Sequence, residues 1–163
     1  MLVDFKKLPD HARIWIYPSN RYFSEVEQQT LKGSLSNFLS HWTSHNQSLE
    51  ASFDLPYNRF IVIGINQQTT QASGCSIDAS VRFIQELEKQ FDVILLDKMN
   101  VTFKQGNYLS YKPLNEFVKM SKAKSKSISK ETIVFNNLVD TVGDYKNFWE
   151  IPARESWHSR FIK

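Results

Sequence analysis

Hydrophobic and polar positions follow two periods in the first two thirds of this chain. Segments that alternate every second residue, or that are apolar throughout, predict strands at 13–17, 49–55, 60–65, 93–96 and 99–104. Apolar residues three and four positions apart predict one helix from Ser24 to about His45 and another from about Ser76 to Phe91. The segment FIVIGI at 60–65 is apolar on both faces, so we expect it in the middle of a sheet.

The order of these elements through residue 104 is β-α-β-β-α-β, the split βαβ pattern of ferredoxin-like folds. We therefore expect an α+β protein with a ferredoxin-like sheet that carries two helices on one face. Ser24 and Glu27 have the spacing of a capping box at the start of the first helix. Ser76 is the expected cap of the second helix.

Residues 105–163 are expected to extend the 1–104 core within a single domain, 1–163. The string QGN at 105–107 predicts a hairpin turn with a return strand at 108–112, and Pro113 can start a short helix through Met120. The segment 119–130 holds five lysines, four serines and no acidic residue, which indicates a mobile, solvated loop. A last strand is expected at 132–135.

Composition excludes two large classes of nucleotide-binding protein. The 163 residues include only five glycines, and no two of them are closer than ten positions. A Walker A loop needs two glycines five positions apart and then lysine, and a dinucleotide-binding loop needs three glycines close together. Neither a P-loop nor a Rossmann loop fits this sequence, and we expect no cofactor.

Charge and cysteine content favour a protein of the cytoplasm. A single cysteine cannot form an intramolecular disulfide, and the chain has no apolar run long enough for a signal peptide or a membrane span. The net charge of +3 is too small to indicate a nucleic-acid partner. We therefore expect a small anionic ligand or a protein partner, with no membrane association.

The most distinctive chemistry lies at Cys75, in the string ASGCSID. A thiol at a helix N-terminus lies near unpaired amides and the positive end of the helix dipole, which favour the nucleophilic thiolate. With Ser73, Gly74, Ser76 and Asp78, the thiol predicts either a nucleophile or a small anion-binding pocket. The alternative is that Cys75 is a small buried residue beside an ordinary cap.

The C-terminal string SWHSRF offers partners for this thiol. If the tail folds over the Cys75 loop, His158 could deprotonate the thiol and Arg160 could hold an anionic substrate. The alternative is that Trp157 and Phe161 anchor the tail to the core while His158 and Arg160 face water. His41 and His45 have the i, i+4 spacing of a metal-binding pair, but without evident further ligands we expect no metal site.

The sheet suggests a second class of function. If the isoleucines of the strand at 13–17 face the helices, then Arg13, Trp15 and Tyr17 lie on the opposite face, together with Phe60. Aromatic residues on such a face stack bases in RNA-recognition modules, but an exposed apolar cluster more often marks packing or self-association. The alternative function is therefore a protein-interaction module, with a homodimer as one form, rather than a nucleic-acid-binding one.

Four blocks of the sequence carry a family resemblance: WIYPSNR, ASGCSIDASVRFIQEL, ETIVFNNLV and ARESWHSRF. They resemble a family of small bacterial proteins frequently labelled "ABC transporter ATPase", and the resemblance covers nearly the whole chain. It implies no catalytic residue. The strings nearest to the LSGGQ signature of such ATPases, LKGS at 31–34 and ASGC at 72–75, each lack the paired glycines.

Overall fold

The computed structural model describes residues 1–125 and 127–162. The chain divides into two compact units. Unit 1 comprises residues 1–96 and 140–144, and unit 2 comprises residues 97–139 and 145–163. The described residues form four α-helices and three antiparallel sheets, which confirms the α+β class.

Unit 1 is built on a three-stranded antiparallel sheet. Its strands are β1 (Arg13–Pro18), β4 (Glu50–Asp54) and β5 (Phe60–Asn66), in the order β1-β5-β4. The first six residues of β5 are buried, so the strand predicted for the middle of a sheet is indeed the central one. A two-stranded hairpin of β2 (Thr43–Ser44) and β3 (Gln47–Ser48) precedes β4.

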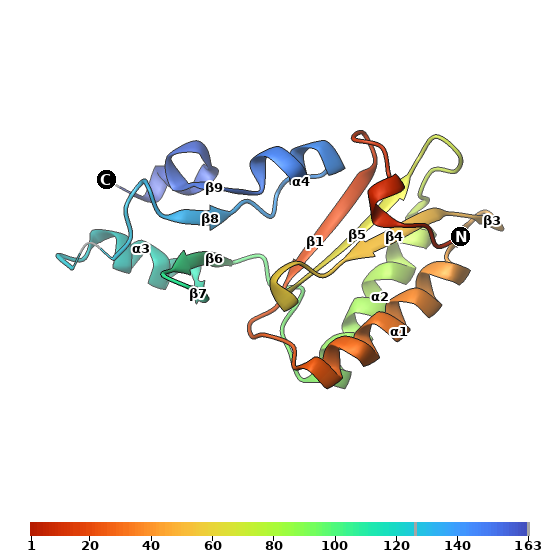
Figure 1. The fold of residues 1–163 in the computed structure, drawn as a ribbon, viewed down its shortest axis with the longest axis horizontal. Coiled ribbons are helices and arrows are strands. Elements are labelled where there is room, and N and C mark those ends of the chain that lie inside the picture. Colours follow the sequence, from red (N-terminus) through yellow and green to blue (C-terminus); the bar gives the residue numbers. More distant parts are fainter. Residues whose placement is uncertain (126, 163) are drawn as a thin grey trace. The chain divides into compact units, whose positions relative to one another are not determined.

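Two helices pack on one face of this sheet (Figure 1). The first, α1 (Glu25–His41), begins with the predicted capping box, in which Ser24 and Glu27 bind each other's backbone amides. The second, α2 (Gly74–Phe91), is capped by Ser73 rather than by Ser76. Ser76 is instead the third helical residue and completes a reciprocal capping box with Ser73, so the cap lies three positions earlier than expected.

The register of the sheet determines which side chains meet the helices. Trp15 lies opposite Ile63 and Tyr17 lies opposite Ile61, and all four belong to the hydrophobic core that includes α1 and α2. The intervening positions face the other way. There Gly64 lies against Leu8, which follows the short helix η1 (Phe5–Lys7).

The strand predicted at 93–96 does not form. The side chain of Glu88 in α2 accepts hydrogen bonds from the amides of Leu95 (2.8 Å) and Leu96 (3.1 Å), which holds this segment in an irregular conformation. The outer edge of β1 carries a different segment. The amide of Ile14 donates to the carbonyl of Asp140 at 2.9 Å, and Arg13 forms an antiparallel bridge with Thr141.

Unit 2 contains a four-stranded antiparallel sheet in the order β7-β6-β8-β9. Its strands are β6 (Asn100–Gln105), β7 (Tyr108–Pro113), β8 (Ile133–Phe135) and β9 (Glu150–Pro152). The predicted hairpin joins β6 to β7, and Gly106 in its turn has a φ of +62°, a conformation that glycine adopts without strain. The core of this unit gathers Phe103, Phe117 and Val134.

The remaining elements of the chain are short. Helix α3 (Leu114–Lys122) follows β7, and α4 (Val142–Phe148) begins in unit 1 and ends in unit 2. Three further 3-10 helices are η2 (Pro56–Asn58), η3 (Ala153–Glu155) and η4 (Trp157–Phe161). No helix in the described part of the chain has the length and apolar character needed to cross a membrane.

The lysine-rich segment at 119–130 is partly helix and partly an exposed loop, as the sequence predicted for the loop, with one buried residue. Its first four residues complete α3, and Ile128 is only 3% exposed in the core of unit 2. Ser129 and Thr132 close the segment, because the amide of each is bonded to an oxygen of the other. Lys126 lies outside the described residues.

Candidate functional site

The capping box of α2 determines how Cys75 is presented. Ser73 accepts a hydrogen bond from the amide of Ser76 at 3.1 Å, and its own amide donates to the Ser76 hydroxyl at 2.7 Å. These bonds leave out the amides of Gly74 and Cys75, the first two residues of the helix. The Cys75 thiol is free and exposed, so the alternative of a buried cysteine is wrong.

Cys75 lines an open pocket of about 630 Å³ within unit 1. Three elements form the walls of this pocket: the last turn of α1, the β2–β3 hairpin and the first turn of α2. Its polar lining includes Asn37, His41, His45, Asn46, Ser73 and Cys75. No carboxylate is among the described residues that line it. The pocket thus combines one thiol with two imidazoles and the N-terminal end of a helix.

The two histidines reach the pocket from different elements. Helix α1 ends at His41, and His45 lies in the turn of the β2–β3 hairpin with a φ of 51°. The i, i+4 pair expected from a helix through His45 is therefore absent. The Nδ1 of His41 lies 2.8 Å from the carbonyl oxygen of Asn37, which can only accept, so Nδ1 carries the proton. In the neutral ring, the Nε2 of His41 then keeps its lone pair.

Trp42 joins the two helices that flank the pocket. Its indole nitrogen donates a buried hydrogen bond of 2.8 Å to the carbonyl of Ser76, so the end of α1 is tied to the start of α2. Its ring also packs edge-on against Trp15, with centroids 6.1 Å apart. Beside it, Phe38 stacks on Phe83 of α2 at 4.3 Å. This aromatic support was missed from sequence, where the apolar spacing predicted only a helix that continues past this position to about His45.

The structure assembles only part of the predicted site. Ser73, Cys75 and Ser76 line the pocket, whereas Asp78 is exposed on α2 and does not. A Cβ atom at Gly74 would meet no atom within 4 Å, so no close backbone contact requires glycine there. Over the residues described, no three His, Cys, Asp or Glu side chains lie close enough to hold a metal ion.

His158 belongs to unit 2 and is 1% exposed. Its Nδ1 lies 2.7 Å from the Ser156 hydroxyl, and its ring stacks on Trp157 with centroids 3.8 Å apart. Burial lowers the pKa of His158 to about 4. The expectation that this residue faces water is wrong, and a ring enclosed in this way is poorly placed to accept a proton from a substrate or a thiol.

Arg160 is exposed on η4 of unit 2, as expected for a residue that faces water. Its guanidinium carbon lies 5.9 Å from the centre of the Phe161 ring. Trp157 and Phe161 are both half-buried, and Trp157 packs on the core of unit 2, which fits their predicted role as anchors of the tail. Neither His158 nor Arg160 lines the Cys75 pocket.

The predicted interaction face of the sheet does not exist as one surface. Trp15 and Tyr17 point toward the helices of unit 1, and Tyr17 is 8% exposed. Phe60 has the opposite orientation, because its neighbour Ile61 is the residue that faces the helices, and Phe60 is fully buried. Arg13 is half-buried with its guanidinium 4.6 Å from the Trp15 ring. Successive residues of a strand point to opposite faces of the sheet. Because the sequence analysis placed the isoleucines of β1 against the helices, it assigned Trp15 and Tyr17 to the wrong face.

Comparisons of the chain with profiles of known protein families, with curated proteins and with solved structures find no match. The chemistry of the Cys75 pocket is therefore the basis for a functional assignment.

Proposed function

We propose that unit 1 binds a small anionic ligand in the Cys75 pocket and that the Cys75 thiol is its reactive group. The observation that carries this proposal is the lining of the pocket: an exposed thiol at the start of α2 shares one cavity with His41 and His45. Backbone amides at a helix N-terminus attract anions, and the described lining contains no carboxylate that would repel one.

The expected chemistry is nucleophilic displacement: the Cys75 thiolate forms a bond to an electrophilic atom of the ligand, and the bond from that atom to its leaving group breaks, with the electron pair departing on the leaving group. The proton of the thiol passes to an imidazole of the pocket. The lone pair on Nε2 of His41 suits it to this role, since Nδ1 is already bonded to Asn37. His45 stands on the hairpin and supplies a second basic group. The buried His158 is not required in this scheme.

The order and pairing of the strands in unit 1 support a more specific fold. Apart from the β2–β3 hairpin, the elements of unit 1 follow the order β1-α1-β4-β5-α2, which matches the first five elements of a ferredoxin-like fold. The sheet order β1-β5-β4 corresponds to the first, third and second strands of that fold. We propose that unit 1 is a variant of that fold in which the 140–141 segment lies at the edge of β1 where the fourth strand would pair. The resemblance of four sequence blocks to a bacterial family stays a prediction and supplies no activity.

The proposal is tested by the rate at which iodoacetate alkylates Cys75 at pH 7. His41→Gln and His45→Gln each remove one imidazole from the pocket while keeping a polar side chain. We expect alkylation to slow by about tenfold in at least one of them, which corresponds to about 1.4 kcal/mol in the activation barrier. The matched control is His11→Gln, since His11 is exposed in unit 1 but does not line the pocket. Equal rates in all four proteins would show that the imidazoles do not act on the thiol.

A further inference from the structure

The two units of the chain have opposite net charges. Unit 1 contains eight lysines and arginines against twelve acidic residues, a net charge of −4. Unit 2 contains twelve against five, a net charge of +7. The mild total of +3 is therefore the sum of an acidic unit and a strongly basic one. A charge asymmetry of this kind indicates that the basic part interacts with a polyanion.

Several cations of unit 2 gather where α3 meets η4. Lys119 and Lys122 are three residues apart on α3, so they share one face of the helix, and Lys124 lies two residues after its end. The Ser121 hydroxyl donates to the carbonyl of Phe161 at 2.9 Å, which places the end of α3 against η4 and its Arg160. All four cationic side chains are exposed. We call this set, Lys119, Lys122, Lys124 and Arg160, the basic surface.

The cations of the basic surface are not held in ion pairs with described residues. None of its four cations forms an ion pair with any carboxylate in the described part of the chain. Two of the five acidic residues of unit 2 are paired elsewhere, Glu131 with Arg154 and Glu150 with Lys104. Four exposed cations at the end of α3 and on the adjoining η4 attract a partner with closely spaced negative charges.

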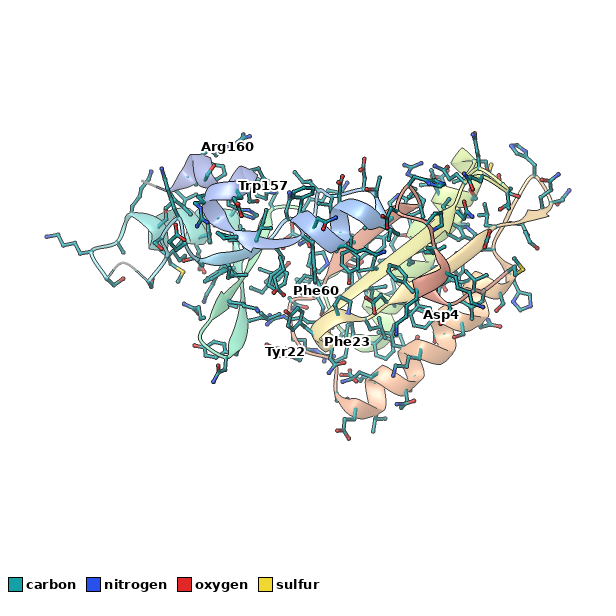
Figure 2. All side chains as sticks on the ribbon, turned by 45° about the horizontal axis from the view of Figure 1, so that its top comes forward. Asp4, Tyr22, Phe23, Phe60, Trp157 and Arg160 are labelled. Atoms are coloured by element: carbon teal, nitrogen blue, oxygen red, sulfur yellow. The ribbon has the colours of Figure 1, made fainter. Side chains whose placement is uncertain are left out.

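We infer that the basic surface of unit 2 binds the phosphate backbone of single-stranded nucleic acid. Lysine contacts phosphates as a point charge without reading sequence, so the binding is nonspecific and depends steeply on salt. Trp157 and Arg160 lie on the same short helix (Figure 2), which also carries Phe161. Both aromatic rings are half-buried, and aromatic rings beside cations are the groups on which unpaired bases stack.

An anionic membrane is the less suitable polyanion for this surface. Peripheral proteins insert exposed apolar side chains beside their cations. The large exposed hydrophobic residues of unit 2, among those described, are Met99, Tyr108, Leu138 and Phe148, and none of them lies on α3 or η4. The surface therefore offers charge and aromatic faces but no group to insert into a bilayer.

The test measures fluorescence anisotropy of a labelled oligothymidylate of about twenty nucleotides, titrated with the full chain from 50 to 200 mM salt. Four phosphate contacts predict a slope of log K against log salt near −3, from about −0.7 for each contact. In the triple variant Lys119→Gln, Lys122→Gln and Lys124→Gln, one contact remains. We expect its slope to approach about −0.7 and its affinity at 50 mM salt to fall at least about tenfold.

The matched control removes three exposed lysines of unit 1, Lys6, Lys7 and Lys32, again as glutamine. It lowers the net charge of the chain by the same amount and is expected to keep wild-type binding and slope. Circular dichroism shows whether both triple variants are folded. The inference is overturned if the wild type does not bind the oligonucleotide, if both triple variants lose affinity equally, or if the protein partitions more strongly onto phosphatidylserine vesicles at equal phosphate concentration.

Discussion

At the scale of single residues, two glycines have opposite roles in unit 1. Gly33 lies within α1, and a Cβ there would have open space around it. Gly64 lies in the central strand, where a Cβ would come within 2.8 Å of Leu8 and 3.2 Å of Ile14. At Gly33, glycine only weakens the helix, because its helix propensity is low. At Gly64, glycine is needed because a larger residue would collide with Leu8 and Ile14.

Alanine substitutions at these positions should therefore change stability in opposite directions. Gly33→Ala is expected to raise the free energy of unfolding by about 1 kcal/mol, because alanine is the better helix former. Gly64→Ala is expected to lower it by about 1 kcal/mol or more, because Leu8 and Ile14 must shift. Urea unfolding followed by circular dichroism measures both values. A loss of stability in Gly33→Ala would contradict the exposed position given to this residue.

His158 makes the stability of unit 2 depend on pH. Burial lowers its pKa from 6.5 to about 4, so between these values the unfolded chain binds a proton that the folded chain does not. The free energy of unfolding should therefore fall as the pH drops from 6.5 to 4, by up to about 3 kcal/mol.

The ring of His158 can be followed directly by NMR. Its carbon shifts should stay those of a neutral imidazole down to about pH 5. The variant His158→Phe keeps a ring of similar size and should unfold with a weaker pH dependence between 6.5 and 4. Titration of His158 near pH 6.5 would show that the ring is accessible to water.

At the scale of elements, Arg21 connects the start of α1 to the end of α2. Its guanidinium pairs with both carboxylate oxygens of Glu27, each at 2.8 Å, and also donates to the carbonyl of Phe91 at the end of α2. The hydrogen bond from Arg21, with a second from the Ser24 amide, lowers the pKa of Glu27 to about 2.

Replacing Glu27 with glutamine should separate the ion pair from the cap, because glutamine still accepts the hydrogen bond of a capping box. We expect a loss of about 0.5 to 1 kcal/mol at pH 7, measured by urea unfolding. The lowered pKa means that the contribution of Glu27 is complete above about pH 4.5 and is lost as the pH falls toward 2. Glu27→Gln should lack this acid-side decline, whereas Glu25→Gln in the same helical turn should keep it.

Elements with a strong local signal were predictable from sequence. The apolar run FIVIGI is the central strand because both of its faces are buried, and Ser24 with Glu27 caps α1 as expected. Where contacts with neighbouring side chains determine the local structure, the hydrophobic pattern predicted it wrongly. Glu88 takes the amides that a strand at 93–96 would use, and β1 is apolar on both faces, so its sequence does not reveal which face meets the helices.

The candidate site was predictable only at its centre. The start of a helix near Cys75 is a local feature, and the structure places the thiol there. His41 and His45 come to the same pocket because α1 stops at residue 41 and the chain turns through a hairpin, whereas the apolar spacing predicted a helix that continues to about His45. The indole of Trp42 then bonds to Ser76, 34 residues away, a contact that periodicity cannot indicate.

At the scale of the whole molecule, the overall composition hides a difference in net charge between the two units. The total charge of +3 argued against a nucleic-acid partner, but this total conceals −4 on unit 1 and +7 on unit 2. The two residues of the predicted catalytic pair belong to different units, Cys75 to unit 1 and His158 to unit 2. Each unit therefore carries its own proposed activity, a thiol pocket in unit 1 and a polyanion surface in unit 2.

The Cys75 pocket is proposed to attract anions to a reactive thiol. This attraction is tested most directly by the ratio of the rate constants for iodoacetate, which is anionic, and iodoacetamide, which is neutral, at Cys75. We expect a ratio clearly above that of N-acetylcysteine at the same pH and low ionic strength, because the backbone amides at the start of α2 favour the anionic reagent. A wild-type ratio equal to or below the free thiol's would contradict the proposal.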